Sequence, residues 1–300
     1  MLWTPRLTAG LIALFAAATA PAGAAGAAPA DFDARWQSAL AELPVLPPDA
    51  LSADCPGEVS FPVTEVARAD AAWSPGSDSA ATPVVHVVET LADRRPPDWV
   101  RSHLYLAARG DVPLGAWLAQ ARPDARHGPT LSVLAACQAV NLVRSRPGAT
   151  APRVGLVGDG FGAQIALAAA ALVPDRVAWL VLHEPRPALY RRPDGAPTAC
   201  PELRAALAQM ANAGDVAYLD PLSFAPQVRC PTFVTAGAAD REALLSEIEA
   251  LFAALTCPRD RRVIDHLGHC PSANLPDLAA ILARMDGFAE GWHAARLTSP

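Results

Sequence analysis

An apolar strand that runs through a glycine-dense turn directly into an apolar helix constrains this 300-residue chain more than any other feature. The predicted strand covers residues 154–157, the turn 158–162 and the predicted helix 165–172. Glycines at both ends of such a turn let the strand and the helix approach closely around a strained central residue. The stretch therefore predicts a sheet whose strands are connected through helices.

The residue at the centre of this turn is Gly160. The arrangement matches the G-x-S-x-G elbow that presents a nucleophilic serine between a strand and a helix, except that Gly160 stands where the serine would be. Glycine relieves the strain of the turn but has no oxygen for attack on an ester. An elbow centred on Asp159 would supply a carboxylate nucleophile, but it would place Val157 and Phe161 at the positions that must be small.

Strands and helices alternate along the rest of the chain. This pattern predicts an α/β fold: a mainly parallel, twisted sheet with helices on both faces, in one domain. The other predicted helices are residues 31–43, 97–101, 131–143, 241–255 and 275–289. The other predicted strands are residues 59–66, 84–88, 103–107, 177–182, 232–235 and 262–264.

The first 28 residues are typical of a secretory signal peptide. Arg6 provides a positive charge, residues 7–20 are apolar, and small residues at 22–27 give two A-x-A cleavage sites. We expect cleavage between Ala24 and Ala28, which leaves residues 29–300 as a single secreted or periplasmic domain with no membrane contact. An uncleaved anchor is the alternative, although the apolar run is short for a membrane span.

The net charge, the cysteines and the histidines indicate which partners, disulfides and metal sites to expect. A net charge of −6 argues against a nucleic-acid partner. An exported chain can form disulfides, and we expect at least one, although Cys137 lies in an apolar run that also suits a buried thiol. His266 and His269 have no third ligand placed beside them, so no metal site is expected. The six cysteines, whose pairing the sequence does not fix, are Cys55, Cys137, Cys200, Cys230, Cys257 and Cys270.

Two further side chains follow predicted strands in the order that a hydrolytic triad needs. Asp240 follows the strand at 232–235, and His269 follows the strand at 262–264. Elbow, acid and histidine come in this order along α/β-hydrolase chains. Asp240 would then orient the imidazole, and His269 would act as the general base. Taken alone, Asp240 also fits a turn or the N-cap of the helix that follows it.

Several short motifs, in a shared order, make residues 29–300 resemble the acetylxylan esterase and cephalosporin-C deacetylase family of carbohydrate esterases. The resemblance implies an α/β-hydrolase fold, and it implies that Asp240 and His269 are the remaining members of an esterase triad. The motifs that carry it are residues 31–36, 97–99, 105–110, 153–172, 220–225, 228–231, 237–240 and 268–269.

The same resemblance implies what this chain lacks. The family's elbow serine corresponds to Gly160, and its oxyanion loop corresponds to Glu89-Thr90. Thr90 and Phe161 are then the expected oxyanion residues, but a carboxylate at Glu89 would oppose a developing oxyanion. A segment that contributes to oligomer contacts in the family is shortened here to about residues 116–130, so a large ring oligomer is not expected.

Three functions stay open. The first is a non-catalytic or very weak pseudo-esterase, a binding or scaffold protein for a small-molecule or carbohydrate ester. The second is an active carboxylic-ester hydrolase that deacetylates carbohydrate with a non-standard nucleophile. Neither requires a cofactor. The third is a dinucleotide-binding protein, because Gly158, Gly160 and Ala163 also fit G-x-G-x-x-A. Glu184 would then be the ribose-binding acid; otherwise it lines the site or forms a loop salt bridge.

Overall fold

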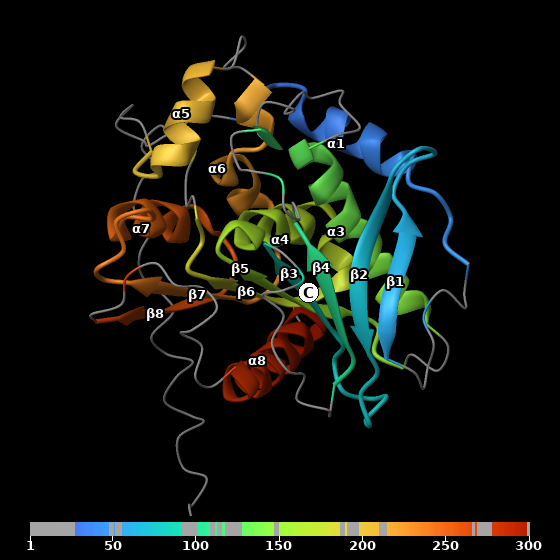
Figure 1. Cartoon of the computed structure of the whole chain (residues 1–300). Helices are drawn as coiled ribbons and strands as arrows, with labels where there is room; N and C mark the ends of the chain where they lie inside the picture. Colours follow the sequence, from blue (N-terminus) through green and yellow to red (C-terminus); the bar gives the residue numbers. More distant parts are fainter. Residues whose placement is uncertain are drawn as a thin grey trace, which may run out of the picture.

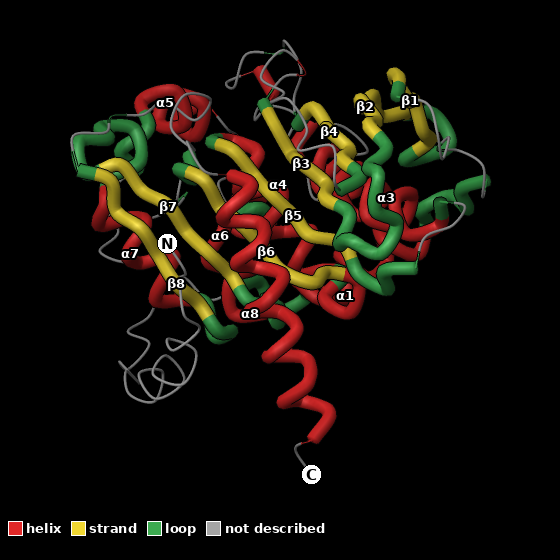
Figure 2. Tube along the Cα trace, turned by 90° about the horizontal axis from the view of Figure 1, so that it is seen from below, coloured by secondary structure: helices red, strands yellow, loops and turns green. Residues whose placement is uncertain are grey.

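The computed structural model describes most of the chain from residue 28 onward and forms an eight-stranded sheet (Figures 1 and 2). The described residues are 28–47, 51, 56–89, 91, 101–108, 112, 116–117, 128–146, 150–186, 190, 198–209, 215–265, 268 and 278–298. The predicted signal peptide and the predicted helix at 97–101 lie almost wholly outside them.

The strand order in the sheet is β1-β2-β4-β3-β5-β6-β7-β8. β2 pairs antiparallel with β1 and with β4, and all the other pairs are parallel. The strands are β1 Gly57–Pro62, β2 Arg68–Ser74, β3 Val84–Val88, β4 His103–Ala107, β5 Val154–Asp159, β6 Val177–His183, β7 Thr232–Gly237 and β8 Arg259–Ile264. The predicted mainly parallel α/β sheet is therefore confirmed.

Helices cover both faces of this sheet, as predicted. Among the described helices, α8 lies on one face in Figure 1, and α1, α3, α4, α6 and α7 lie on the other. The last turns of α8 project beyond the sheet (Figure 2). The helices are α1 Phe32–Ala41, α3 Gly128–Ser145, α4 Phe161–Leu172, α5 Pro201–Gln209, α6 Pro221–Phe224, α7 Leu245–Ala254 and α8 Leu278–Thr298.

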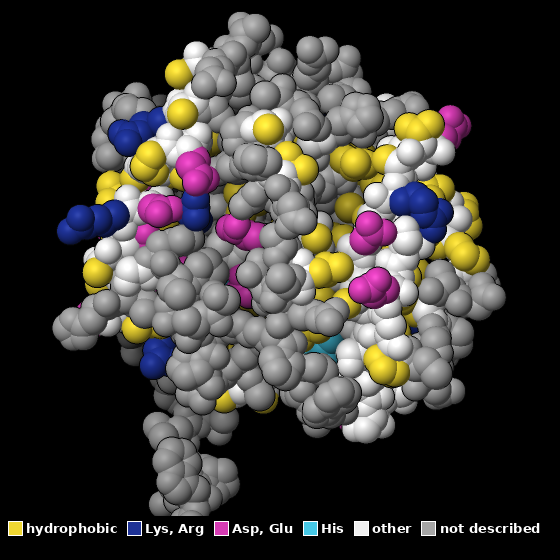
Figure 3. Space-filling view, in the orientation of Figure 1, with side chains coloured by type: hydrophobic (Ala, Val, Ile, Leu, Met, Phe, Trp, Pro, Cys, Tyr) yellow, Lys and Arg dark blue, Asp and Glu magenta, His cyan; other side chains and the backbone are white. Residues whose placement is uncertain are grey.

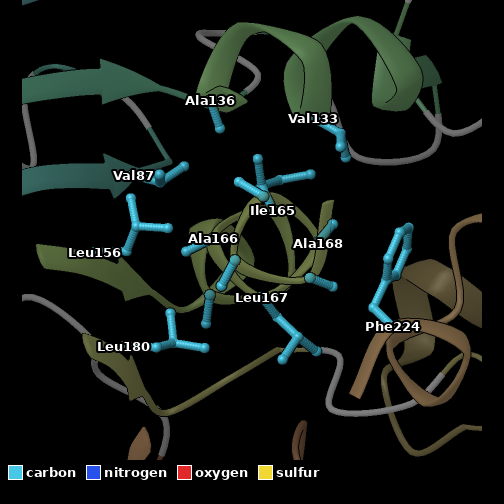
Figure 4. Packing of buried hydrophobic residues seen from close by; sticks show 14 of the residues in the cluster. Val87, Val133, Ala136, Leu156, Ile165, Ala166, Leu167, Ala168, Leu180 and Phe224 are labelled. Carbon is cyan, nitrogen blue, oxygen red and sulfur yellow. The ribbon is translucent and has the colours of Figure 1, made fainter. Parts of the chain in front are cut away.

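The apolar core has a layer on each face of the sheet. Val85 and Val87 of β3 belong to the layer under α3 and α4, whereas Val84 belongs to the layer under α8. All of α4 is buried, and Figure 4 shows it surrounded by side chains from β3, β5, β6 and α3 and by Phe224. An Ala-rich helix that is apolar on every side requires such an environment. The core therefore fixes the position of α4, whose first turn borders the candidate site.

Charged side chains are dispersed over the described surface. On the face shown in Figure 3, coloured acidic side chains lie across the middle and coloured arginines lie mostly toward the edges. Among the described residues, the most exposed large apolar side chains are Val45 and Val66, which are separate single residues in the sequence. Among the described helices, none combines the length and the apolar character that crossing a membrane requires.

Several elements were not predicted, among them β2, α5 and α6, and several ends were misplaced. β2 has the sequence RADAAWS, in which only Trp73 favours a strand, and it forms through its antiparallel pairing with two neighbours. α5 was also missed. The predicted helix start at residue 241 is wrong, since α7 begins at Leu245. The strand predicted at 59–66 ends at Pro62.

Four of the six cysteines are described, and all four are free thiols: Cys137, Cys200, Cys230 and Cys257. The expectation of a disulfide is therefore not met among the described residues. Cys55 and Cys270 lie outside them. Cys137 is fully buried, which agrees with the buried-thiol alternative, and burial raises the pKa of its thiol to about 12.

Candidate functional site

Gly160 forms the turn between β5 and α4 in a conformation that is strained for residues other than glycine. Its φ is 53° and its ψ is −115°. Its N–H donates to the carbonyl of His183 at 2.9 Å, and its carbonyl accepts from the N–H of Arg186 at 3.0 Å. The strained residue is thus Gly160 rather than Asp159, which is the last residue of β5.

Two flanking glycines allow the elements around the elbow to meet closely. A Cβ on Gly162 would lie 2.0 Å from the carbonyl oxygen of Val87, and a Cβ on Gly158 would lie 2.4 Å from the Cα of Ala163. Both distances are far below van der Waals contact. β3, β5 and α4 therefore meet in the way that the glycine spacing predicted.

The side chain of Glu89 points at the start of α4. Glu89 directly follows β3, and its Oε1 accepts from the N–H of Phe161 at 3.3 Å. Phe161 is the first residue of α4, so its N–H belongs to the donors that no helical carbonyl can reach, at the positive end of the helix dipole. Its ring packs edge-on against Trp117, with 4.6 Å between the ring centroids. The Glu89 carboxylate is thus bound to the Phe161 N–H, which is the donor that the sequence predicted for an oxyanion.

Asp240 is buried in the turn after β7. Its Oδ1 accepts from the N–H of Glu242 at 2.7 Å and from the N–H of Ala243 at 3.0 Å. These bonds fix one oxygen of the carboxylate within a turn, which is one of the two local roles that the sequence suggested for Asp240. Both N–H groups lie before the start of α7, so Asp240 is not the N-cap of that helix. His269 and Thr90 lie outside the described residues, so the Asp240–His269 pair and the role of Thr90 stay predictions.

Glu184 lies next to the elbow and is fully buried rather than exposed on a loop. Its φ is 44°, which is uncommon for a residue with a side chain, and its N–H donates to the carbonyl of Thr235 at 3.1 Å. His183 precedes it, and its Nδ1 is hydrogen-bonded to Oγ1 of Thr235. The end of β6 is thus tied to both the elbow and β7.

Arg186 links three segments around the site, and no sequence pattern indicated this role. Its side chain forms ion pairs with Glu242 at 2.9 Å and with Glu202 of α5 at 3.0 Å. Burial disfavours the charged guanidinium, but the hydrogen bond to Cys200 and the two glutamates raise the pKa of Arg186. Because its backbone also binds Gly160, Arg186 connects the elbow to the turn that holds Asp240.

Gln164, on the first turn of α4, was also not predicted from the sequence to belong to the site. It is buried, and its amide oxygen and nitrogen both lack a hydrogen-bond partner within the part of the chain that the structure describes. A polar residue inside an otherwise apolar helix was the signal that could have indicated it.

Comparisons with known proteins show similarity of this chain's fold to solved structures. No family model and no curated protein matches it. Among solved structures, it is similar to acetyl xylan esterase 1 from Thermoanaerobacterium sp. JW/SL YS485, with a TM-score of 0.67, 19% identity and coverage of 86% of this chain and 95% of that one. For acetyl xylan esterase from Paenibacillus sp. R4 the TM-score is 0.63 and the identity 17%, and the alignment covers 88% of this chain and 95% of that one. For dienelactone hydrolase from Anabaena variabilis the TM-score is 0.52 and the sequence identity 17%, and the alignment covers 79% of this chain and 97% of that one.

The chain has the α/β-hydrolase fold. In this fold the sharp turn after the elbow strand carries the nucleophile, and the N–H of the next residue helps to bind the oxyanion. At the turn that follows β5, this chain has Gly160, which has no side chain, and then Phe161, whose N–H binds Glu89.

Proposed function

We propose that this chain is an exported relative of the acetyl xylan esterases that has lost ester turnover, or retains it only very weakly, and acts by binding. One observation carries the proposal: beside an elbow residue with no side chain, the carboxylate of Glu89 accepts from the Phe161 N–H. The first feature removes the nucleophile, and the second opposes the charge that ester hydrolysis develops.

Both steps of acyl transfer depend on these positions. Without a hydroxyl at position 160, a base at His269 has no proton to remove and no acyl-enzyme can form. A tetrahedral oxyanion also needs donors aimed at it in a site that excludes water. The Glu89 carboxylate takes up one such donor and places a like charge beside the developing oxyanion, so both contributions to catalysis are weakened.

The same carboxylate argues against dinucleotide binding. In that function the pyrophosphate sits at the amino end of the helix that follows the glycine-rich turn. Here Glu89 already supplies a negative group to the first N–H of α4. A second anion at this end would meet electrostatic repulsion.

Ester hydrolysis by the purified mature protein tests the loss of turnover. We expect the wild type to hydrolyse an activated acetate ester at the same rate as His269→Ala, because no nucleophile depends on that histidine. Initial rates with equal amounts of folded protein provide the measurement. Wild-type turnover that disappears in His269→Ala would reveal a nucleophile other than an elbow serine and would favour the active hydrolase.

The ligand class is proposed from the relatives, two of which are acetyl xylan esterases. We expect the protein to bind acetylated xylo-oligosaccharide more tightly than the same oligosaccharide after deacetylation. Isothermal titration calorimetry of both sugars measures the difference. Equal heats and affinities for the two sugars would contradict recognition of the acetyl group.

Export is proposed from the first 28 residues. We expect the protein recovered from outside the cytoplasm to begin between Ala25 and Pro29. Intact-mass analysis and N-terminal peptide mapping check this. A native protein that retains residues 1–24 would show that the segment is not a cleaved signal.

A further inference from the structure

Two free cysteines lie side by side at the amino ends of neighbouring strands. Cys230 comes two residues before Thr232, which begins β7, and Cys257 comes two residues before Arg259, which begins β8. Thr232 and Arg259 are register partners, and the Thr232 N–H donates to the carbonyl of Pro258 at 2.9 Å. Adjacent strands lie about 4.8 Å apart, within the span of Cα positions that a disulfide can bridge.

The hydroxyl of Thr232 contacts both cysteine residues. Its Oγ1 lies 3.3 Å from Sγ of Cys257 and donates to the carbonyl of Cys230 at 3.1 Å. The pKa values of the two thiols respond to this contact. Burial and the neighbouring Cys257 raise the pKa of Cys230, whereas a hydrogen bond to Thr232 opposes that rise. Burial also raises the pKa of Cys257, and its hydrogen bond to Thr232 again opposes that rise.

The strand that Cys257 precedes lies at the edge of the sheet and pairs with one neighbouring strand. β8 has the sequence RDRRVI, is at the edge of the sheet, and has no buried side chain. Its backbone is held by the pairing with β7, and its side chains add ion pairs to Glu249 and Arg284 and contacts of two arginines with the ring of Phe252. A covalent link at the amino end would secure this edge strand to the buried strand β7.

We propose that Cys230 and Cys257 form a disulfide when the chain meets a disulfide oxidant. One thiolate attacks the oxidant, an S–S bond breaks, and one thiol leaves with a mixed disulfide formed on the protein. The second cysteine then attacks that mixed disulfide and releases the second thiol. The two protein thiols lose two electrons and two protons, and the oxidant disulfide is reduced to two thiols.

The environment of the pair determines when the bridge forms. Thiolates are the reacting species, and they are scarce when the pKa is raised by burial. Oxidation therefore occurs during folding, before the two thiols are enclosed, and the completed bridge resists reductants as long as the protein stays folded. The bridge closes a loop of about 28 residues, long enough to restrict the unfolded chain.

Oxidative refolding of the full chain tests the pairing directly. Reduced, denatured protein is refolded in a glutathione redox buffer, alkylated without reduction and digested for mass spectrometry. We expect one peptide pair joined through Cys230 and Cys257, lighter by two hydrogen atoms than the separate peptides, with Cys137 and Cys200 alkylated. Alkylation of both Cys230 and Cys257, or a link from either one to another cysteine, would overturn the proposal.

A thermal measurement tests whether the bridge stabilises the fold. Wild type that is denatured, reduced and refolded in the presence of a reductant is expected to have a Tm about 5–10 °C lower than wild type refolded in the glutathione redox buffer. The same treatment of Cys257→Ala should cause a smaller decrease, whereas Cys200→Ala, the matched control, should respond as the wild type does. Equal decreases in the wild type and Cys257→Ala would count against a Cys230–Cys257 bond. The peptide map of the wild type decides the pairing even if a variant does not fold.

Discussion

In the Gly160→Ser background, replacing Glu89 by glycine is expected to raise the rate of acetate-ester hydrolysis by about 100-fold. Gly160→Ser alone returns a hydroxyl to the elbow but leaves the Phe161 N–H bound to the Glu89 carboxylate. We therefore expect the single variant to gain little. Removal of the carboxylate frees that donor and removes the like charge, so the double variant combines a nucleophile with an oxyanion donor.

Glu89→Gln in the same background separates charge from occupancy. The amide oxygen of glutamine can still accept from the Phe161 N–H, so the donor stays occupied while the negative charge is lost. If occupancy dominates, Glu89→Gln recovers far less activity than Glu89→Gly. Initial rates on an activated acetate ester measure each variant, and a double variant no faster than Gly160→Ser would refute the blocking role of Glu89.

Folding must be verified for these variants because the elbow is strained. A serine at φ 53° costs about 1–3 kcal/mol relative to glycine, so the Tm of Gly160→Ser should fall. Circular dichroism and thermal unfolding identify the variants that remain folded at the assay temperature.

The substitution Gly162→Ala is expected to lower the free energy of unfolding by about 3 kcal/mol or more. Its Cβ would lie 2.0 Å from the carbonyl oxygen of Val87 and 2.6 Å from the carbonyl carbon. Val87 is in β3, which is paired with β4 and β5, so this backbone cannot move aside without disturbing the sheet. α4 would have to withdraw from a core that surrounds it on every side.

Gly287→Ala provides the matched control for that substitution. Gly287 lies within α8, is exposed, and has no atom within 4 Å of a built Cβ. Alanine favours the helix by up to about 1 kcal/mol, so this variant should be equal to or slightly more stable than the wild type. Chemical denaturation compares the two. A Gly162→Ala variant as stable as Gly287→Ala would contradict the close approach of α4 and β3.

The sequence predicted the elements whose local pattern agrees with their environment. β3 and β6 are apolar apart from one histidine each, which is typical of strands buried on both faces, and α4 follows directly from the glycine-rich turn. β2 was missed because RADAAWS lacks branched and aromatic residues apart from Trp73. The start of α7 was misplaced because the Asp240 side chain binds two backbone N–H groups and forms a turn first.

The site was partly predictable for a similar reason. The order of Gly160, Asp240 and His269 is visible in the sequence, since each follows a strand. The contact between Glu89 and Phe161 joins residues 72 positions apart, so a local pattern cannot show that it forms. The ion pairs of Arg186 likewise depend on how two loops and α5 converge.

The left-handed backbone at Gly160 makes the proposed loss of catalysis hard to reverse in evolution. Glycine occupies φ 53° without strain, whereas a serine there destabilises the fold before any activity returns, since Glu89 still blocks the neighbouring donor. Substitution of Glu89 first would remove the partner of the Phe161 N–H and yield no nucleophile. Each single step is thus neutral or harmful, and only the two together regain ester chemistry. A return to ester hydrolysis would therefore require both substitutions together, which would preserve the proposed non-catalytic state.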